Sequence, residues 1–494
     1  MRVLPRPRSF KLMLGAAGFL SLVLAGCDLG PGPVQPKLSM PAAWDNQPQT
    51  ASAATAWPAA DWWKTFGSSE LDSLITQAQA GNLDLAGAAA RVMQAEAQLR
   101  VSNATLWPRL DFTSDLKQRG PAGPVSSDIS SDLGGSSHGD TQHRTSFDLG
   151  VAAKYEADFW GKNADDAAAA RASLNASRFN RETVALTVTS GVASTYLQIM
   201  TLKDRIALAR QNLANAQAVE HVVESKARNG AVSPLDLAQQ RGQVAAQQAA
   251  IPPLELQEKQ AMNALALLLG RNPEGFTLSG TGLKGIALPT VSAGLPSALL
   301  TRRPDIQAAE ANLAAADANL MAARAAMLPS INLDAGVTVE AIVQSLEFGG
   351  VGAAYSAAAA LAQPIFDAGS LKAQKDVAAG KQLELVQTYR STILGALSDT
   401  ENALASVDSL KTQQQFQGTQ VSEAGTALAI SQSQYRNGAS ELLPVLDAQR
   451  TLFQAQDTEL QLALSQFQAA VNLYKALGGG WQAGNDTKAA VAAN

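Results

Sequence analysis

The sequence predicts a mainly α-helical protein that also carries transmembrane β-hairpins and is built from two structural repeats. Long proline-free stretches place apolar residues every three or four positions, and shorter stretches alternate apolar with polar residues. The first pattern is typical of an amphipathic helix, and the second of a strand with one apolar face. Similar motifs recur later in the chain, which predicts that both patterns occur twice.

The composition excludes several functional classes. The 494 residues carry a formal net charge of −5, and only 16% of them are charged. Beyond the extreme N-terminus no stretch is rich in Lys or Arg, so the chain lacks the basic patch of a nucleic-acid-binding protein. One cysteine and three histidines exclude a disulfide scaffold and argue against a Cys/His cluster. We therefore expect no metal and no cofactor other than lipid.

Residues 1–26 have the features of a lipoprotein signal peptide. An apolar run from Leu12 to Leu24, too short for a transmembrane helix, follows four basic residues: Arg2, Arg6, Arg8 and Lys11. The run ends in Leu24-Ala25-Gly26-Cys27, which resembles a bacterial lipobox. We expect a diacylglycerol and an N-acyl chain on Cys27. Cleavage after residue 26 removes four positive charges and changes the net charge from −5 to about −9. In some bacteria, an aspartate directly after the lipidated cysteine retains a lipoprotein in the inner membrane. Asp28 holds that position, so its effect on sorting stays open.

The chain repeats itself at two fixed offsets. Motifs at 82–85 and 106–108 recur at 303–306 and 327–329, an offset of 221 residues. Later motifs, such as the Arg-Asn-Gly-Ala segments at 228–231 and 436–439, lie 208 residues apart. The difference predicts a longer polar loop in the first copy, at 120–142. The expected boundaries are an extended or equatorial N-terminal segment at 27–81, repeat 1 at 82–270, a linker at 271–296, repeat 2 at 297–480 and a disordered tail at 481–494.

One β-hairpin is predicted in each repeat, at about 109–159 and about 330–366. Residues 147–159 alternate apolar and polar side chains most clearly, residues 331–341 do so as well, and the alternation at 110–116 and 355–366 is weaker. Such strands approach the roughly 9–11 residues that cross a bilayer. The alternative that stays open is a soluble hairpin with one buried face.

Each hairpin is followed by a long predicted helix. No proline interrupts residues 161–228, a length of about 100 Å at roughly 1.5 Å per residue. Asn229-Gly230 and Asn437-Gly438 can adopt positive φ and end a helix, so the chain is expected to turn there into a second helix. Ser233 is predicted to cap that helix ahead of Pro234, and Ser440 with Glu441 to do the same in the second half.

Four strands cannot close a transmembrane barrel, because the smallest such barrels have about eight. Open sheet edges are not tolerated in lipid. Either the hairpins lie outside the membrane, or several chains pool their strands, with two chains supplying about eight and three chains about twelve.

The order and spacing of the motifs resemble the TolC-like outer membrane factors, in particular the lipoprotein branch that serves resistance-nodulation-division (RND) efflux pumps. The resemblance runs from Trp62 to Trp481, and its most specific segments are Tyr155–Gly161, Leu299–Ile306 and Leu446–Arg450. It implies a homotrimer with a 12-stranded β-barrel in the outer membrane. That barrel would be continuous with a long α-helical periplasmic barrel, girdled at its equator by smaller elements.

The resemblance also implies the function: passive conduction through an outer membrane exit duct. An inner-membrane RND transporter would drive export of drugs or metals, and a periplasmic membrane-fusion adaptor would join it to the duct. Adaptor docking would fall on the two helical tips, at Asn229, Gly230 and Ser233 in one tip and at Asn437 and Gly438 in the other.

The same resemblance suggests a gate at the second tip. In relatives, an aspartate two residues after the glycine of this tip helps to close the periplasmic aperture. Here Ser440 holds that position and is followed by Glu441, which is therefore the candidate gate carboxylate. Three carboxylates drawn together repel one another and bind cations. The alternative is that Glu441 only favours the start of its helix.

Other functional classes fit less well. The sequence has no Gly-rich phosphate loop after a predicted strand and no Gly-x-Ser-x-Gly elbow, so no enzyme is expected. A periplasmic adaptor lipoprotein would have one central helical hairpin between β-domains, rather than two hairpin repeats. A duct for type I protein secretion shares the tunnel and stays open as an alternative. The cargo, the pump and the adaptor are not identified by the sequence.

Overall fold

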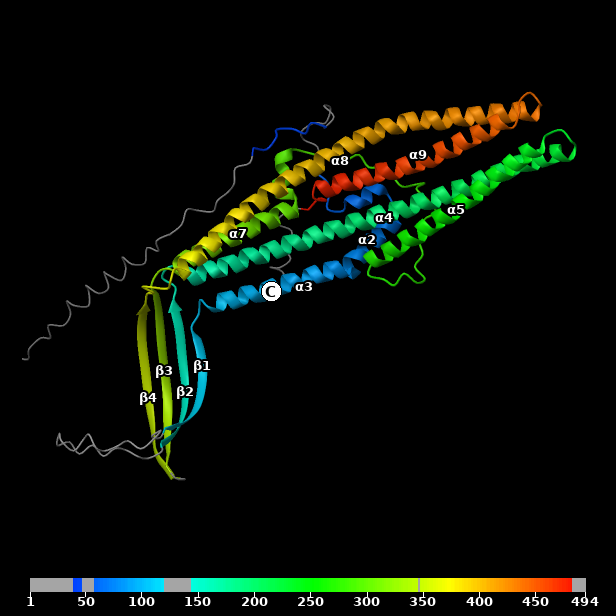
Figure 1. The fold of residues 1–494 in the computed structure, drawn as a ribbon. Coiled ribbons are helices and arrows are strands. Elements are labelled where there is room, and N and C mark those ends of the chain that lie inside the picture. The colour runs from blue at the N-terminus through cyan, green and yellow to red at the C-terminus, as the bar shows by residue number, and fades with distance from the viewer. Residues whose placement is uncertain (1–38, 47–56, 120–143, 345–346, 482–494) are drawn as a thin grey trace, which may run out of the picture. The chain divides into compact units, whose positions relative to one another are not determined.

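The computed structural model describes residues 39–46, 57–119, 144–344 and 347–481 (Figure 1). The signal peptide, Cys27, Asp28, the loop at 120–142 and the tail beyond Trp481 lie outside the described residues. The chain divides into two compact units. The first holds the described parts of 95–174 and 312–385, and the second those of 36–94, 175–311 and 386–494.

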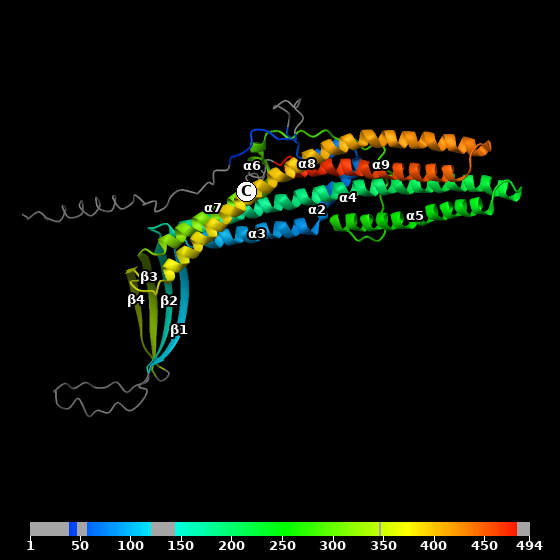
Figure 2. The same cartoon turned by 45° about the horizontal axis from the view of Figure 1, so that its top comes forward.

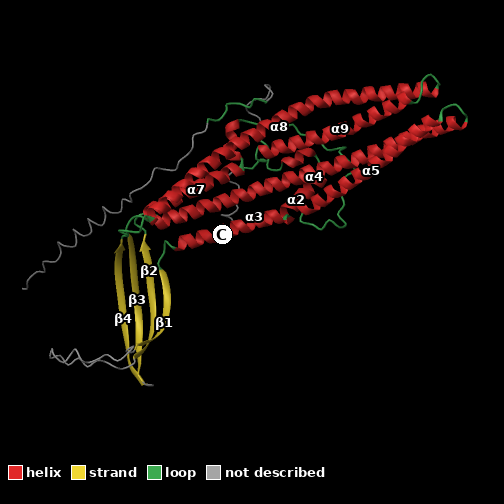
Figure 3. Cartoon of the chain, in the orientation of Figure 1, coloured by secondary structure: helices red, strands yellow, loops and turns green. Residues whose placement is uncertain are grey.

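A four-stranded antiparallel sheet dominates the first unit (Figure 3). Its strands pair in chain order: β1 (Arg109–Arg119), β2 (Arg144–Ala157), β3 (Ser330–Gln344) and β4 (Glu347–Ala362). The ladder between β2 and β3 joins the two repeats, with Val151 opposite Val337. The fourth strand begins and ends earlier than the predicted 355–366. Its Gly- and Ala-rich sequence puts small residues on both faces, which hides the alternation.

The two faces of this sheet differ in polarity, because successive side chains of a strand point to opposite sides. One face exposes large apolar side chains, among them Phe112 (72% exposed), Val337 (56%) and Tyr355 (87%). The opposite face carries ionisable side chains in cross-strand register, such as Lys154 opposite Asp334. The alternation in the sequence thus predicts the two faces correctly.

The helices of the two repeats have matching lengths. α4 (Lys162–Arg228) and α8 (Ser370–Arg436) have 67 residues each, and α3 (Leu83–Ala104) and α7 (Pro304–Ala325) have 22 each. α5 (Pro234–Leu268) runs beside α4, and α9 (Leu443–Ala476) beside α8 (Figures 1 and 2). No helix in the described part of the chain is long and apolar enough to cross a membrane.

In the second unit, short elements pack across the middle of the two helical hairpins, which are the α4–α5 pair and the α8–α9 pair. They are η1 (Trp62–Phe66), α2 (Ser69–Gly81), η3 (Pro296–Ala298) and α6 (Leu299–Arg302). We call residues 40–46, 57–81 and 271–302 the belt. The N-terminal segment predicted as extended therefore contains a 13-residue helix, α2, whose N-terminus is capped by Ser68 and which buries Leu71, Leu74, Ile75 and Ala78.

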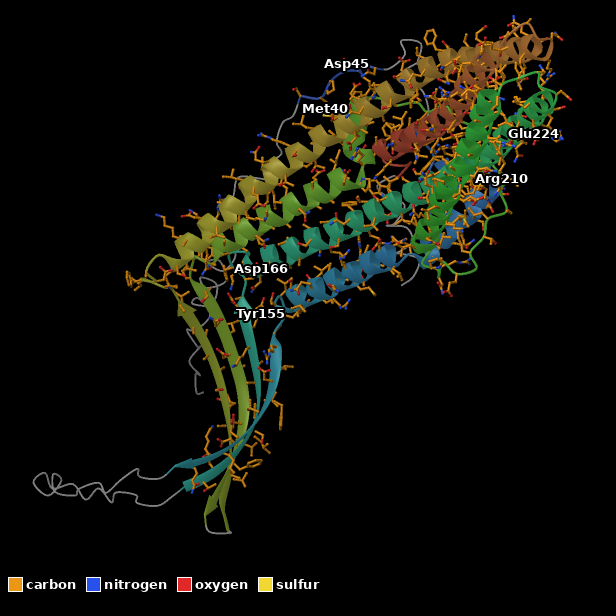
Figure 4. All side chains as sticks on the ribbon, turned by 45° about the vertical axis from the view of Figure 1, so that its right-hand side comes forward. Met40, Asp45, Tyr155, Asp166, Arg210 and Glu224 are labelled. Carbon is orange, nitrogen blue, oxygen red and sulfur yellow. The ribbon has the colours of Figure 1, made fainter. Side chains whose placement is uncertain are left out.

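Two apolar clusters hold the belt to the hairpins. The first cluster contains Val192 of α4 and Leu265 of α5 in repeat 1 and reaches α9 of repeat 2, where Trp62, 1% exposed, stacks on Tyr474 with ring centroids 4.8 Å apart. On repeat 2, Trp44 and Leu299 pack with Ile393 of α8 and Leu473 of α9. Met40 and Asp45, labelled in Figure 4, belong to this second contact, where the Asp45 amide donates to Glu401 Oε1 at 2.9 Å.

A partly exposed carboxylate fixes the linker part of the belt. Glu70 of α2 accepts hydrogen bonds from the Ser279 amide at 2.7 Å, the Gly280 amide at 3.1 Å and the Tyr196 hydroxyl at 3.1 Å. Burial opposes ionisation of Glu70, but these hydrogen bonds outweigh it and hold the pKa of Glu70 below its ordinary value.

Candidate functional site

Each long helix ends in the turn that its sequence predicts. We call residues 226–237 tip 1 and residues 434–446 tip 2. Gly230 and Gly438 both adopt a φ of 73°. The Ala231 amide donates to the Lys226 carbonyl at 2.9 Å, and the Ala439 amide to the Gln434 carbonyl at 2.8 Å. These bonds close Schellman turns, which satisfy carbonyls left free at the helix ends.

Tip 1 continues into α5 through a reciprocal capping box. The Asp236 amide donates to Ser233 Oγ at 3.2 Å, and the Ser233 amide donates to Asp236 Oδ2 at 3.0 Å. Pro234, the first helical residue, has no N–H to satisfy. The prediction of Ser233 as the cap is confirmed.

Tip 2 begins its second helix differently, and the prediction of Ser440 as its cap is wrong. α9 starts at Leu443 behind Leu442, and no side-chain hydrogen bond caps it. Ser440 Oγ instead lies 3.3 Å from the carbonyl oxygen of Glu441. Pro444 has no N–H, and the Val445 amide donates to the Leu442 carbonyl at 2.9 Å, so these positions need no capping side chain. Glu441 is exposed and precedes the first helical residue by two positions.

The two tips contact each other. Leu442, 1% exposed, packs with Val445, Leu446 and Val223 in one apolar cluster. Lys226 Nζ donates to the Tyr435 carbonyl at 2.8 Å and lies 4.2 Å from the centre of the Tyr435 ring. Burial, with the charge of Asp236 as a further cause, raises the pKa of Tyr435.

Neither Lys226 nor Tyr435 is predicted as a site residue from the sequence. Each lies just before a helix-ending Asn-Gly pair, and Tyr435 is an aromatic residue within an otherwise small and polar helix end. Those positions are a local signal, but their contact joins residues 209 apart.

Charged contacts tie the two helices of repeat 1 together along their length. Arg210 of α4 donates to Glu255 of α5 at 2.7 Å, and Arg241 of α5 lies 3.6 Å from Glu224 of α4 (Figure 4). Among the described residues, no group of three or more His, Cys, Asp or Glu is placed to hold a metal ion.

The segment Leu299–Ile306 contains a half-buried arginine, Arg303, that holds several helices together. Arg303 donates to Asp305 at 2.7 Å, to Asp399 of α8 at 3.2 Å and to the Ala476 carbonyl of α9 at 3.1 Å. Burial disfavours the charge, but the two carboxylates outweigh burial and raise the pKa of Arg303. This arginine thus joins the start of α7 and the end of α9 to the middle of α8.

The polar face of the sheet presents charged rows across neighbouring strands. Asp115 is opposite Asp148, and Asp148 is opposite Glu340. Lys117 Nζ lies 2.9 Å from Asp148 Oδ2. Such a face suits water, whereas the opposite, apolar face suits lipid.

Comparison with known proteins agrees with this arrangement. The family model described as outer membrane efflux protein matches residues 74–271 and 295–479. The pyoverdine export outer membrane protein OpmQ of Pseudomonas putida is 43% identical, over 95% of this chain and 98% of its own. The cation efflux system protein CusC of Escherichia coli is 32% identical, over 94% of this chain and 98% of its own.

A solved structure supports the same family. The open-state MtrE outer membrane channel of Neisseria gonorrhoeae matches with a TM-score of 0.80 and 28% identity, over 92% of this chain and 99% of its own. The fold is that of the trimeric TolC-like channels, which combine a β-barrel with a helical barrel extending into the periplasm. The relatives are channels rather than enzymes. The chain therefore belongs to the outer membrane efflux protein family and is the outer membrane channel of a tripartite efflux system.

Proposed function

We propose that this channel is the exit duct for an iron-chelating peptide of the pyoverdine type. The observation that carries the proposal is the 43% identity to a pyoverdine export protein over 95% of the chain, against 32% to a cation efflux protein. The polar face of the sheet supports a hydrophilic cargo, because its charged rows keep a passage hydrated.

The proposed assembly is a homotrimer in which three four-stranded sheets form a 12-stranded barrel. Each chain leaves β1 and β4 at the sheet edges without a partner strand among the described residues, and lipid requires such edges to be paired. Diacylglycerol and an N-acyl chain on Cys27 would add a second anchor in the outer membrane.

A periplasmic membrane-fusion adaptor would dock on the tips, at Asn229, Gly230 and Ser233 and at Asn437 and Gly438. Beside these turns Leu235 is 64% exposed and Leu443 is 51% exposed. Exposed leucines next to rigid turns favour a protein contact. Ser440 and Glu441 lie in the second turn, where Glu441 would contribute to a carboxylate ring at the aperture.

Deletion of the gene in its own host tests the cargo. Pyoverdine should fall in the medium and accumulate in the periplasm, and a plasmid copy should reverse both changes. Unchanged secretion would contradict the proposal. Unchanged secretion with copper or silver sensitivity would favour cation efflux, and the loss of an exported protein would favour type I secretion.

Energy coupling tests the proposed RND partner, because such transporters use the proton gradient. A protonophore added while cellular ATP is maintained should stop secretion. Secretion that continues until ATP is depleted would contradict the RND assignment and indicate an ATP-driven pump.

Cys27→Ala tests the lipid anchor. The variant should incorporate no labelled fatty acid, whereas the wild-type chain should incorporate it. Equal labelling of both proteins would contradict lipidation at Cys27.

A further inference from the structure

The seam between α8 and α9 contains a polar groove that none of the roles described above uses. Its volume is about 480 Å³, and eight polar residues line it: Arg303 from the turn before α7, Asp399, Asn402 and Ser406 from α8, and Ser465, Gln468, Asn472 and Lys475 from α9. Within each helix these residues are three or four positions apart, so each set lies on one helix face. The groove extends along about two helical turns, roughly 10 Å.

Repeat 1 carries small or apolar residues at three of these positions. At the offset of 208, the residues Asp399, Asn472 and Lys475 correspond to Gly191, Ala264 and Leu267, whereas Asn402, Ser406 and Gln468 correspond to the polar residues Ser194, Gln198 and Gln260. A side-chain methyl of Leu268 lies 3.6 Å from where a Cβ of Gly191 would be. The two charged side chains and one amide of the groove are therefore specific to repeat 2.

The groove has unused hydrogen-bonding capacity. The side chains of Gln468, Asn472 and Lys475 make no hydrogen bond or ion pair within the described part of the chain. The Asp399 carboxylate is paired with Arg303, but it accepts only at Oδ2, which leaves Oδ1 available. The groove thus offers this carboxylate oxygen, the ammonium of Lys475 and the amides of Asn402, Gln468 and Asn472. An amide side chain can donate to and accept from a peptide group, while the Lys475 ammonium can bind the carboxylate end of a zwitterionic peptide and Asp399 Oδ1 its ammonium end.

The groove and the belt lie on different sides of the hairpin. In α8 the belt packs on Ile393, Ala396, Ala403 and Leu404, of which Ala403 also lines the edge of the groove. In α9 the belt packs on Phe467, Leu473, Tyr474 and Leu477. With 3.6 residues per turn, the centres of the belt-facing set and of the polar groove-facing set are roughly 120° apart on α8 and roughly 160° apart on α9. A belt across the inner surface of a duct would obstruct it, so the belt covers the outer surface and the groove faces the passage.

From this geometry we propose that the groove is a transit site for zwitterionic peptide cargo on the inner wall of the duct. The inference rests on the proposed function, in which the cargo is a peptide. Three copies, one in each protomer, surround the passage and retain a passing peptide weakly.

The test measures peptide binding to the purified full-length trimer in detergent by saturation-transfer NMR. The probe is tetra-alanine with free termini, and its comparator is the same peptide acetylated and amidated. The test variant combines Asn472→Ala with Lys475→Leu, which places the residues of repeat 1 in repeat 2. It should bind the free-termini peptide about tenfold more weakly than wild type, because two polar partners are lost.

A matched control, Lys411→Leu, removes the same charge from α8 outside the groove and should bind as wild type does. If the double variant does not assemble, Asn472→Ala alone should still weaken binding. No binding to wild type, equal binding to wild type and the double variant, or equal binding of free and capped peptides would overturn the inference.

Secretion assays separate this inference from the proposed function. If deletion of the gene leaves pyoverdine secretion unchanged while the wild-type channel binds free-termini peptide through the groove, the proposed cargo is wrong and the groove stands. If deletion abolishes secretion while the groove variant binds peptide as wild type does, the cargo stands and the groove inference is wrong.

Discussion

The two tips share one turn and are stabilised in different ways. In tip 1, Ser233 and Asp236 form a capping box within their own turn, so the start of α5 depends on residues next to it in sequence. In tip 2, α9 has no side-chain cap, and Leu442 is buried against residues of α4 and α8. Tip 1 is thus locally stabilised, whereas tip 2 depends on its contact with tip 1. The difference identifies tip 2 as the part that the loss of one contact can release.

Leu442→Ala should have the largest effect. Truncating a buried leucine costs about 2–5 kcal/mol, and here the loss falls on the contact between the tips. Native-state hydrogen exchange should show faster exchange of the Val445 and Leu446 amides, with tip 1 unchanged. Equal acceleration in both tips would contradict the difference in their stabilisation.

Lys226→Met should weaken the contact between the tips by about 1–3 kcal/mol, which is less than Leu442→Ala, because a charged hydrogen bond and a cation–π contact are lost. Spin labels placed by Asn229→Cys and Asn437→Cys report the distance between the tips by pulsed electron paramagnetic resonance. The distance distribution should broaden in Lys226→Met and be retained in the control Lys226→Arg. An unchanged distribution in Lys226→Met would show that this contact does not hold the tips.

Ser233→Ala and Ser440→Ala form a matched pair. The first should destabilise the start of α5 by about 1 kcal/mol, the usual value of a serine N-cap, and the second should leave α9 unchanged. Exchange at the Asp236 amide measures the first and exchange at Val445 the second. Similar responses in both tips would restore Ser440 as a cap.

Acid should weaken the belt on repeat 1 more than the belt on repeat 2. The pKa of Glu70 is lowered by folding, so its contribution to stability is present at neutral pH and is lost as the pH falls below about 4.5. On repeat 2, the contact of Trp44 Nε1 with the Gly294 carbonyl, 3.0 Å long, involves no titrating group, and the carboxylate at this contact, Glu401, accepts at an exposed site. The protection factors of the Ser279 and Gly280 amides, which are corrected for the intrinsic pH dependence of exchange, should fall in acid in the wild type and should not do so in Glu70→Gln. The same pH dependence in Glu70→Gln would show that another group causes it.

Glu441→Gln should have the smallest effect on structure, because this side chain is exposed and precedes α9. If three copies form a ring at the aperture, the neutral variant should raise the leak conductance of the closed channel without altering exchange in α9. Unaltered leak would favour a role at the helix start alone.

The sequence predicts those elements of the fold that depend on local signals. The alternation along 147–159 and 331–341 requires one polar and one apolar face, and Asn-Gly pairs end helices because glycine accepts positive φ. The start of α9 was mispredicted because two local signals compete: Ser440 is a good cap, but Pro444 and buried Leu442 place the start later.

Contacts between distant parts of the chain left no usable signal. Lys226 and Tyr435 meet across 209 residues, and the groove of repeat 2 brings together α8 and α9 residues of ordinary polar type. Only the internal repeat, which supplies Leu267 for comparison with Lys475, makes the groove stand out. The role of Cys27 lies outside the described residues and stays a prediction.

Conductance of the full-length trimer in a planar bilayer tests most directly whether the chain is a duct closed at tip 2. We expect small, infrequent conductance steps for the wild-type channel and larger, longer-lived ones for Leu442→Ala, with Ser440→Ala like wild type. Absence of conductance in both wild type and Leu442→Ala would contradict the assignment as a duct. Equal conductance in the two would contradict closure at tip 2.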